Sequence, residues 1–306
     1  MIIRQGDKKD IPGMMTLNNQ LYSYQWKKEF YVWQCFENIH PVSFMVAIHD
    51  NTIIGMFGIQ CRTLSNFSIR CGQISWINIH QDWQRKGIFA QLGKKAIAQS
   101  NHLDALCIFA NDAAVGACKK SLDMTFIGKL NRMTLHMSTM NHTYDDAYTY
   151  ETINQNTSFN TFCTNQELFL FDHSSGYRVW RFSQSPVYTY YKITISSGEY
   201  TIIKIFYNHA NRISYGDIVD FECDLKETNK LFLLFSTTIY HLINKGISIA
   251  TTWAIPNSIL CSILKQIGFD ISDHNNYFGM RVFNPEYQAL TNFKQWHIVQ
   301  SDATNY

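Results

Sequence analysis

The segment HQDWQRKGIFAQLGKKAI (His80–Ile97) decides the fold class, because it joins a basic loop, a glycine at position 87 and the start of a helix. It follows ISWINI (Ile74–Ile79), which has the composition of a buried strand. Behind the loop, Ile88, Leu92 and Ala96 recur on one helical face. A helix N-terminus has backbone amides without intrahelical partners and partial positive charge. This strand–loop–helix unit therefore predicts a site for an anion, most simply a phosphate.

The loop residues suit an anion in two ways. Gly87 has no Cβ, so a ligand can approach its backbone closely, and Arg85 and Lys86 add positive charge. A solvated basic turn at the start of a helix is the alternative interpretation of the same residues.

Strands and helices alternate on both sides of this unit. Residues 43–64 predict two strands joined by the polar turn HDNT, and ALCIFA (105–110) predicts a short buried strand. One helix is expected to begin near Ile11 and Pro12, since proline suits a first helical turn, and another over 111–122. The pattern predicts an α/β fold with a mixed sheet.

The second half of the chain repeats the first faintly. Similar elements recur at nearly one spacing: 144 residues from Ile74 to Ile218, 146 from Asn111 to Asn257 and 145 from Asp123 to Gly268. A duplicated fold explains this spacing, and chance similarity between two α/β units is the alternative. We expect domains at 1–140 and 167–306, with the polar stretch 141–166 as a linker or loop.

Composition excludes several classes of protein. The 306 residues are 46% hydrophobic with a net charge of +2, which indicates a folded protein and argues against a nucleic-acid partner. Eight cysteines without a C-x-x-C pair favour free thiols in a reducing compartment, and no metal site is predicted. No signal peptide and no apolar run of about 18 residues is present, so we expect a cytoplasmic protein without a membrane span.

The order of strand, loop, helix, strand, Asn and helix resembles the GNAT acyltransferase superfamily. That family has a Gln/Arg-x-x-Gly-x-Gly/Ala loop that holds the pyrophosphate of acyl-CoA. Gln84, Gly87 and Phe89 occupy the three positions, so Phe89 replaces the usual small residue. The resemblance implies that the end of ISWINI splays from its neighbour and pairs with the pantetheine arm. It places the acyl-CoA site at Ile77, Ile79, Gln84, Arg85, Lys86, Gly87, Ile88, Phe89, Ala90 and Asn111.

Residues 31–56 and the C-terminal WHIVQSDATNY (296–306) resemble a subset of this family, the tandem-domain sugar N-acyltransferases of bacterial polysaccharide pathways. This resemblance implies acyl-CoA as the donor and a nucleotide-linked amino sugar, such as a dTDP-3-amino-3,6-dideoxyhexose, as the acceptor. Two alternatives stay open. One is a GNAT enzyme that acylates a peptide, polyamine or other small amine. The other is an inactive CoA- or nucleotide-binding module.

The second half lacks the glycine loop. The matching position falls in ETNKLFLLF (227–235), which predicts a helix that starts with a buried face. We therefore expect a degenerate second GNAT-like domain that binds no CoA phosphate. It would shape an acceptor pocket, since pockets at domain interfaces are common, or only stabilise the first domain.

Acyl transfer from a thioester needs a neutral amine and a donor for the oxyanion. The backbone amides of Asn78 and Ile79 are the predicted oxyanion donors. The general base is open among Asp220, Glu222, Asp302, His297 and His80, each of which also has a structural interpretation. Many family members use a tyrosine to protonate the leaving thiolate, and the resemblance places Cys118 or Lys119 at that position.

Aromatic and arginine side chains are the candidates for binding the nucleotide or sugar, because rings stack on bases and guanidinium groups suit a diphosphate. Aromatic residues are also typical of a core. The predicted substrate-binding residues are Trp33, Trp180, Arg181, Trp253, Tyr277 and Arg281.

Overall fold

The computed structural model describes residues 1–22, 25–64, 67–100, 102–137, 142–161 and 167–304. The chain divides into two compact units. Unit 1 contains Met1–Gly128 and Asn276–Phe293, and unit 2 contains Lys129–Asn275 and Lys294–Tyr306. The division differs from the expected boundaries at 140 and 167, because residues 276–293 return to the first unit.

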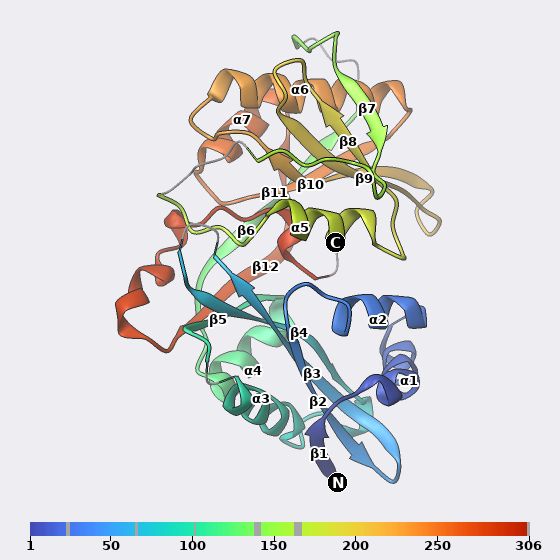
Figure 1. Cartoon of the computed structure of the whole chain (residues 1–306), viewed down its shortest axis with the longest axis vertical. Helices are drawn as coiled ribbons and strands as arrows, with labels where there is room; N and C mark the ends of the chain where they lie inside the picture. The colour runs from blue at the N-terminus through green and yellow to red at the C-terminus, as the bar shows by residue number, and fades with distance from the viewer. Residues whose placement is uncertain (23–24, 65–66, 101, 138–141, 162–166, 305–306) are drawn as a thin grey trace. The chain divides into compact units, whose positions relative to one another are not determined.

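Unit 1 is a mixed sheet with helices on both faces (Figure 1). Its strand order is β1-β2-β3-β4-β5-β12, and all neighbours are antiparallel except β4 and β5. The strands are β1 (Ile2–Gln5), β2 (Val42–His49), β3 (Thr52–Thr63), β4 (Arg70–Ile79), β5 (Ala105–Ala110) and β12 (Asp270–Val282), the last contributing its residues from 276 onward.

Helices α1 (Ile11–Leu21) and α2 (Lys28–Cys35) cover one face of this sheet, and α3 (Ile88–Gln99) and α4 (Asp112–Leu122) cover the other (Figure 1). The predicted stripe Ile88, Leu92 and Ala96 is buried on the sheet side of α3. The HDNT turn is a two-residue hairpin in which Asp50 and Asn51 both have positive φ, a conformation that Asn and Asp tolerate well.

Unit 2 has the corresponding architecture. Its strand order is β6-β11-β10-β9-β8-β7, with β10 and β11 as its parallel pair. The strands are β6 (Thr125–His136), β7 (Thr149–Thr152), β8 (Tyr190–Thr194), β9 (Tyr200–Asn208), β10 (Ile213–Glu222) and β11 (Ile249–Ala254). The helices are α5 (Ser175–Arg178), which continues as the π-helical η3 (Val179–Ser183), α6 (Thr228–Asn244) and α7 (Ile259–Ile267).

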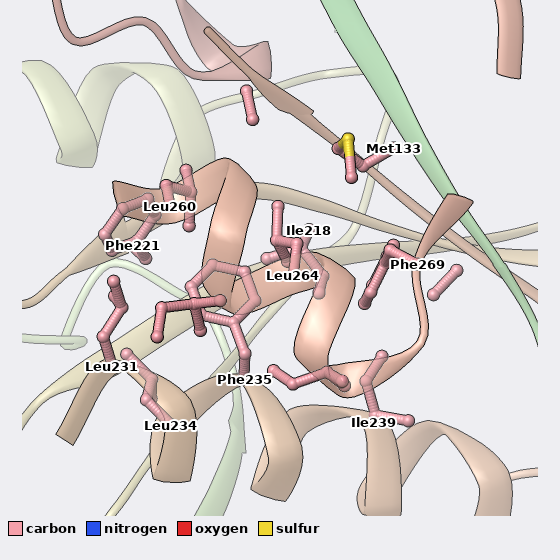
Figure 2. Packing of buried hydrophobic residues seen from close by; sticks show 14 of the residues in the cluster. Met133, Ile218, Phe221, Leu231, Leu234, Phe235, Ile239, Leu260, Leu264 and Phe269 are labelled. Atoms are coloured by element: carbon pink, nitrogen blue, oxygen red, sulfur yellow. The ribbon is translucent and has the colours of Figure 1, made fainter. Parts of the chain in front are cut away.

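The main core of unit 2 lies between its sheet and the pair α6 and α7 (Figure 2). Leu231, Leu234 and Phe235 of α6 meet Leu264 of α7, and Ile218 of β10 packs in the same cluster. Short 3-10 helices complete the chain: η1 (Lys8–Asp10), η2 (Gln81–Trp83), η4 (Pro285–Thr291), η5 (Phe293–Gln295) and η6 (Gln300–Asp302).

The predicted duplication is confirmed in the register of the two sheets. Cys71 pairs with Ala105 in the parallel pair of unit 1, and Tyr215 pairs with Ile249 in that of unit 2, so both positions repeat after 144 residues. The predicted marker residues also share a role, since Asp123 and Gly268 are left-handed C-caps of α4 and α7.

The stretch 141–166 is not all linker, because β7 lies inside it and forms the edge of the unit 2 sheet; residues 141 and 162–166 lie outside the described residues. None of the seven cysteines in the described residues forms a disulfide, and Cys163 lies outside these residues. None of the helices in the described part of the chain has both the length and the apolar composition of a membrane span.

Candidate functional site

A break in the sheet of unit 1 lies at the end of β4. The pairs between β4 and β5 run from Cys71 to Ile74 among the described residues and go no further, although β4 continues to Ile79. On its other edge β4 carries a β-bulge, where the register with β3 shifts between Ser75 and Asn78 and Trp76 has φ +56°. Bulges aim side chains and end pairing, and this one opens β4 away from β5.

Alternation along β4 decides which amides face the opening. The His80 amide donates to Ile54 of β3 over 2.9 Å, so the Ile79 amide points to the opposite edge, toward β5. The Asn78 amide points back to β3 by the same rule. Of the two predicted oxyanion donors, Ile79 therefore has the orientation that an added ligand could use.

The loop after β4 has the backbone that an anion site requires. Arg85 has φ +60° and Gly87 has φ +78°, and Gly87 is the N-cap of α3. A Cβ at Gly87 would meet only Gln91, at 3.8 Å, so this position needs glycine for its φ rather than for space. Residues 84–87 are exposed, which leaves the first amides of α3 open to a ligand.

Side chains around the loop fix its shape. The Gln84 Nε2 donates to the Ile79 carbonyl over 3.2 Å, and the Lys86 Nζ lies 4.9 Å from the centre of the Trp83 ring. Phe89, the departure from the family pattern, turns its ring toward Phe57 in the core, with 5.8 Å between the ring centres. The larger side chain at this position is thus accommodated on the core side.

The residues after β5 have clear structural roles. Asn111 is the N-cap of α4, and its Oδ1 accepts from the Ala114 amide over 3.1 Å. Cys118 is 0% exposed, and burial raises the pKa of its thiol to about 11. Lys119 is exposed, with its Nζ 5.8 Å from the centre of the Phe126 ring. Cys118 therefore fits a place in the core better than the role of proton donor.

Comparison with known proteins agrees with this geometry. Residues 11–124 match the Acetyltransferase (GNAT) family. Unit 1 contains these residues, and we name it the GNAT domain for this similarity. The match and the fold support the predicted class of enzyme, an acyl-CoA-dependent N-acyltransferase. A search with the sequence found no match among curated proteins.

Solved structures share the fold of the whole chain, beyond the GNAT domain. A GCN5-related N-acetyltransferase from Anabaena variabilis has a TM-score of 0.65 at 12% identity, covering 92% of this chain and 73% of that one. A probable N-acyltransferase from Enterococcus faecalis has a TM-score of 0.64 at 9% identity, covering 92% and 73%. The Saccharomyces cerevisiae N-myristoyltransferase, solved with bound myristoyl-CoA, has a TM-score of 0.61 at 10% identity, covering 91% and 82%.

Unit 2 repeats the bulge of the GNAT domain, but its own chain fills the place beside it. The β9–β10 register shifts between Ile218 and Asp220, and the β10–β11 pairs end at Asp217. The Gln300 Nε2 donates to the Thr251 Oγ1 of β11 over 3.2 Å, and Gln300, Ser301 and Asp302 are at most 2% exposed. The C-terminal segment 296–303 therefore packs against β10 and β11 where the GNAT domain is open.

The start of α6 also differs from the start of α3. The helix begins at Thr228, with Glu227 as its N-cap. Residues 228–230 are exposed and Leu231 is the first buried residue, so the expectation of a helix that starts with a buried face was wrong. The sequence before α6 still has no glycine loop that could hold an anion. The carboxylate of Glu227 adds negative charge at the N-terminus of this helix, which disfavours an anion there.

The predicted base candidates form a buried ion network in unit 2. His173 joins two of them: its Nδ1 lies 3.2 Å from Asp220 and its Nε2 lies 2.8 Å from Asp302. The Arg178 guanidinium contacts Asp220 at 3.2 Å and Glu222 at 2.7 Å. The structure thus brings Asp220, Glu222 and Asp302 together, and each of these carboxylates contacts His173 or Arg178.

Electrostatics hold this network in its ionised state. Burial alone would lower the pKa of His173, but Asp220 and Asp302 raise it to about 9. Burial opposes ionisation of Asp220, yet His173 and Arg178 hold its pKa well below the usual range. His173 and Asp220 are therefore both charged at neutral pH. The His173 imidazolium contacts Asp220 of β10 and Asp302 of the C-terminal segment, and so links the two.

The two histidine candidates have other environments. Burial lowers the pKa of His297 to about 4, which leaves a neutral and weakly basic ring. His80 caps η2, where its Nδ1 accepts from the Asp82 amide over 3.3 Å. Both fit a structural interpretation.

The six predicted substrate-binding residues divide between the units. Trp33 of the GNAT domain and Trp180, Arg181 and Trp253 of unit 2 are at most 4% exposed, and the Arg181 Nη2 donates to the Ala303 carbonyl over 3.0 Å. Tyr277 and Arg281 lie on β12 and are partly exposed. A hydrogen bond to Asp112 raises the pKa of Tyr277, and Arg281 donates to the Leu122 carbonyl over 3.0 Å.

Sequence reasoning missed His173, Arg178 and a group of side chains around Trp76. The first two follow the polar stretch 141–166, in a segment for which the sequence predicted no strand or helix. A signal existed in GDIVDFE (216–222), where three carboxylates stand among apolar residues of a predicted strand and so require buried partners.

Proposed function

We propose that the GNAT domain binds acyl-CoA at the Gly87 loop and transfers its acyl group to the amine of a nucleotide-linked amino sugar. The observation that carries the donor half of this proposal is the open end of β4, followed directly by a loop with two positive φ angles and a free helix N-terminus. Backbone amides at that terminus suit the pyrophosphate, and Arg85 and Lys86 supply charge.

The same geometry suggests how the thioester is activated. The pantetheine arm would lie along the unpaired edge of β4, with its carbonyl near the bulge at Trp76. The Ile79 amide, which points to that edge, would donate to the arm or to the oxyanion. The amine nitrogen then attacks the carbonyl carbon, the carbon–sulfur bond breaks, CoA leaves as a thiolate, and the nitrogen loses a proton.

We infer that water accepts this proton. Asp220, Glu222 and Asp302 are ion-paired within unit 2, and none has a carboxylate without a basic partner. His297 is a weak base because its pKa is near 4. Holding donor and amine together then supplies most of the rate enhancement, which for well-oriented reactants is worth about 7–11 kcal/mol.

The acceptor half of the proposal rests on the resemblance of residues 31–56 and 296–306 to the sugar N-acyltransferases. We propose a dTDP-linked 3-amino-3,6-dideoxyhexose as the acceptor, and a cytoplasmic enzyme of bacterial polysaccharide synthesis. Unit 2, which lacks a glycine loop, would bind no CoA.

Mass spectrometry tests the proposal directly. The protein is incubated with acetyl-CoA and, separately, with dTDP-3-amino-3,6-dideoxyglucose, spermidine or a lysine peptide. We expect an acetylated sugar nucleotide and an equal amount of free CoA thiol. Acetylation of spermidine or the peptide alone would support the small-amine or peptide alternative. Binding of CoA without thiol release in any mixture would support the inactive module and contradict the proposal.

A further inference from the structure

A group of uncharged side chains surrounds the bulge of β4 on the face covered by α1 and α2. We call it the bulge-face cluster, and its members are Asn18, Tyr22, Trp26, Phe30, Tyr31, Ser75, Trp76 and Asn78. All are aromatic, amide or hydroxyl side chains. The cluster lies at the bulge where the proposed function places the acyl carbon.

The bulge itself puts two of these side chains together. Ile74 belongs to the core under α3 and α4, so by alternation Ser75 points to the opposite face. Trp76, with φ +56°, packs on that same opposite face beside α2. Gly58 on β3 makes room for it, because a Cβ there would lie 3.1 Å from the Trp76 ring.

Two hydroxyl groups in the cluster lack partners. The Tyr31 hydroxyl and the Ser75 Oγ are buried and form no hydrogen bond within the described residues. Tyr31 is 0% exposed and Ser75 is 7% exposed. A buried polar group without a partner is costly, so such groups call for an explanation, and a ligand that supplies the partner is one. Burial raises the pKa of Tyr31, which keeps its hydroxyl protonated and able to donate.

The other members supply apolar ring faces and amides. The rings of Trp26 and Phe30 stack with centres 3.7 Å apart, and Phe30 and Tyr31 lie 5.4 Å and 5.5 Å from the Trp76 ring. The Asn78 side chain accepts from the Tyr22 hydroxyl over 3.2 Å. Tyr22 is 53% exposed, and Trp26 and Trp76 are partly exposed, so the cluster extends from the surface inward.

We propose that the Tyr31 and Ser75 hydroxyls bind hydroxyl groups of the acceptor's sugar ring, with the aromatic members against its apolar face. This inference rests on the proposed function and names the residues that select the acceptor. Hydroxyl and amide groups beside aromatic ring faces suit a pyranose. A polyamine would need carboxylates to balance its charge, and the bulge-face cluster contains none.

Conservative variants separate this role from a structural one. Tyr31→Phe and Ser75→Ala remove only the unpartnered hydroxyls, so the melting temperature should stay the same or rise. The control is Ser236→Ala on α6 of unit 2, which removes another wholly buried serine hydroxyl that has no partner within the described residues.

Steady-state kinetics with acetyl-CoA and dTDP-3-amino-3,6-dideoxyglucose give the decisive readout. Each cluster variant should raise the KM for the sugar nucleotide about tenfold, the typical effect of one lost hydrogen bond in a buried site. The KM for acetyl-CoA should not change, and Ser236→Ala should leave both constants unchanged.

Three results would overturn the inference. They are an unchanged sugar KM in both variants, a lower melting temperature that shows the hydroxyls are bonded in the fold, or transfer to spermidine or a lysine peptide but not to the sugar. The last result leaves the N-acyltransferase activity in place. Failure of the proposed function is different, because then no amine releases CoA thiol from acetyl-CoA even with the wild-type protein.

Discussion

Replacing His173 with glutamine should destabilise unit 2 strongly below pH 6.5 and hardly at all above pH 9. His173 bridges Asp220 and Asp302, which holds the C-terminal segment against β10. Glutamine has a similar length, but it carries no charge and cannot balance two buried carboxylates. Breaking one partner from a buried ion pair typically costs about 3–5 kcal/mol.

The pKa of His173 sets the magnitude and the pH window. Its folded pKa is about 9, against 6.5 for an ordinary histidine, which corresponds to about 3 kcal/mol. Because the folded pKa is raised, the contribution is complete below pH 6.5 and is lost as the pH rises through about 9. The lowered pKa of Asp220 expresses the same interaction and is not added.

Urea unfolding at several pH values between 6 and 10 measures this effect. The free energy difference between wild type and His173→Gln should be about 3 kcal/mol at pH 6 and should approach zero at pH 10. His209→Gln is the control, because His209 is exposed and should show no such trend. A difference that is absent at pH 6, or that grows with pH, would refute the reasoning.

Three further predictions concern the GNAT domain. Gly87→Ala should lower stability by about 1 kcal/mol in thermal unfolding, because φ is +78° there, and should weaken CoA binding at least tenfold in calorimetric titration. The control Gly116→Ala on α4 should not lower stability. Asn111→Asp should keep the melting temperature, since aspartate also caps a helix. It should raise the KM for acetyl-CoA, because it removes the amide donor, and an unchanged KM would show that Asn111 only caps α4. Cys118→Ala should lose about 1 kcal/mol of stability and keep kcat, because the thiol is buried in the core; a large fall in kcat without unfolding would make it the proton donor.

Local patterns in the sequence were enough to predict most of the elements of the GNAT domain. The turn at Asp50 and Asn51, the stripe on α3 and the glycine at position 87 are encoded within a few residues of where they act. The repeat was also visible, because nearly one spacing relates the two units: 144 residues for the parallel strand pairs and 145 for the C-caps.

The pairing of β12 was not predictable in this way. Its residues 277–282 pair with 105–110 of β5, while β6 pairs with β11 of unit 2. An apolar strand fits equally well beside either of two similar sheets, so its own residues do not specify the partner. The expected second domain, 167–306, therefore includes residues 276–293, which in the folded chain belong to unit 1.

The ion network was hidden for a related reason. The partners of His173 are 47 and 129 residues away in the sequence, so no local pattern joins them. Tyr31 and Ser75 were not predicted for another reason. In the sequence they resemble ordinary core residues, and only the fold shows that their hydroxyl groups have no hydrogen-bond partner within the described residues.

Hydrogen exchange with and without saturating CoA tests the central claim most directly. The account predicts protection of residues 77–90, where the unpaired edge of β4 and the Gly87 loop would contact the cofactor. It predicts no protection of residues 218–231, where unit 2 is filled by its own chain. Protection at both places, or none at residues 77–90, would contradict it.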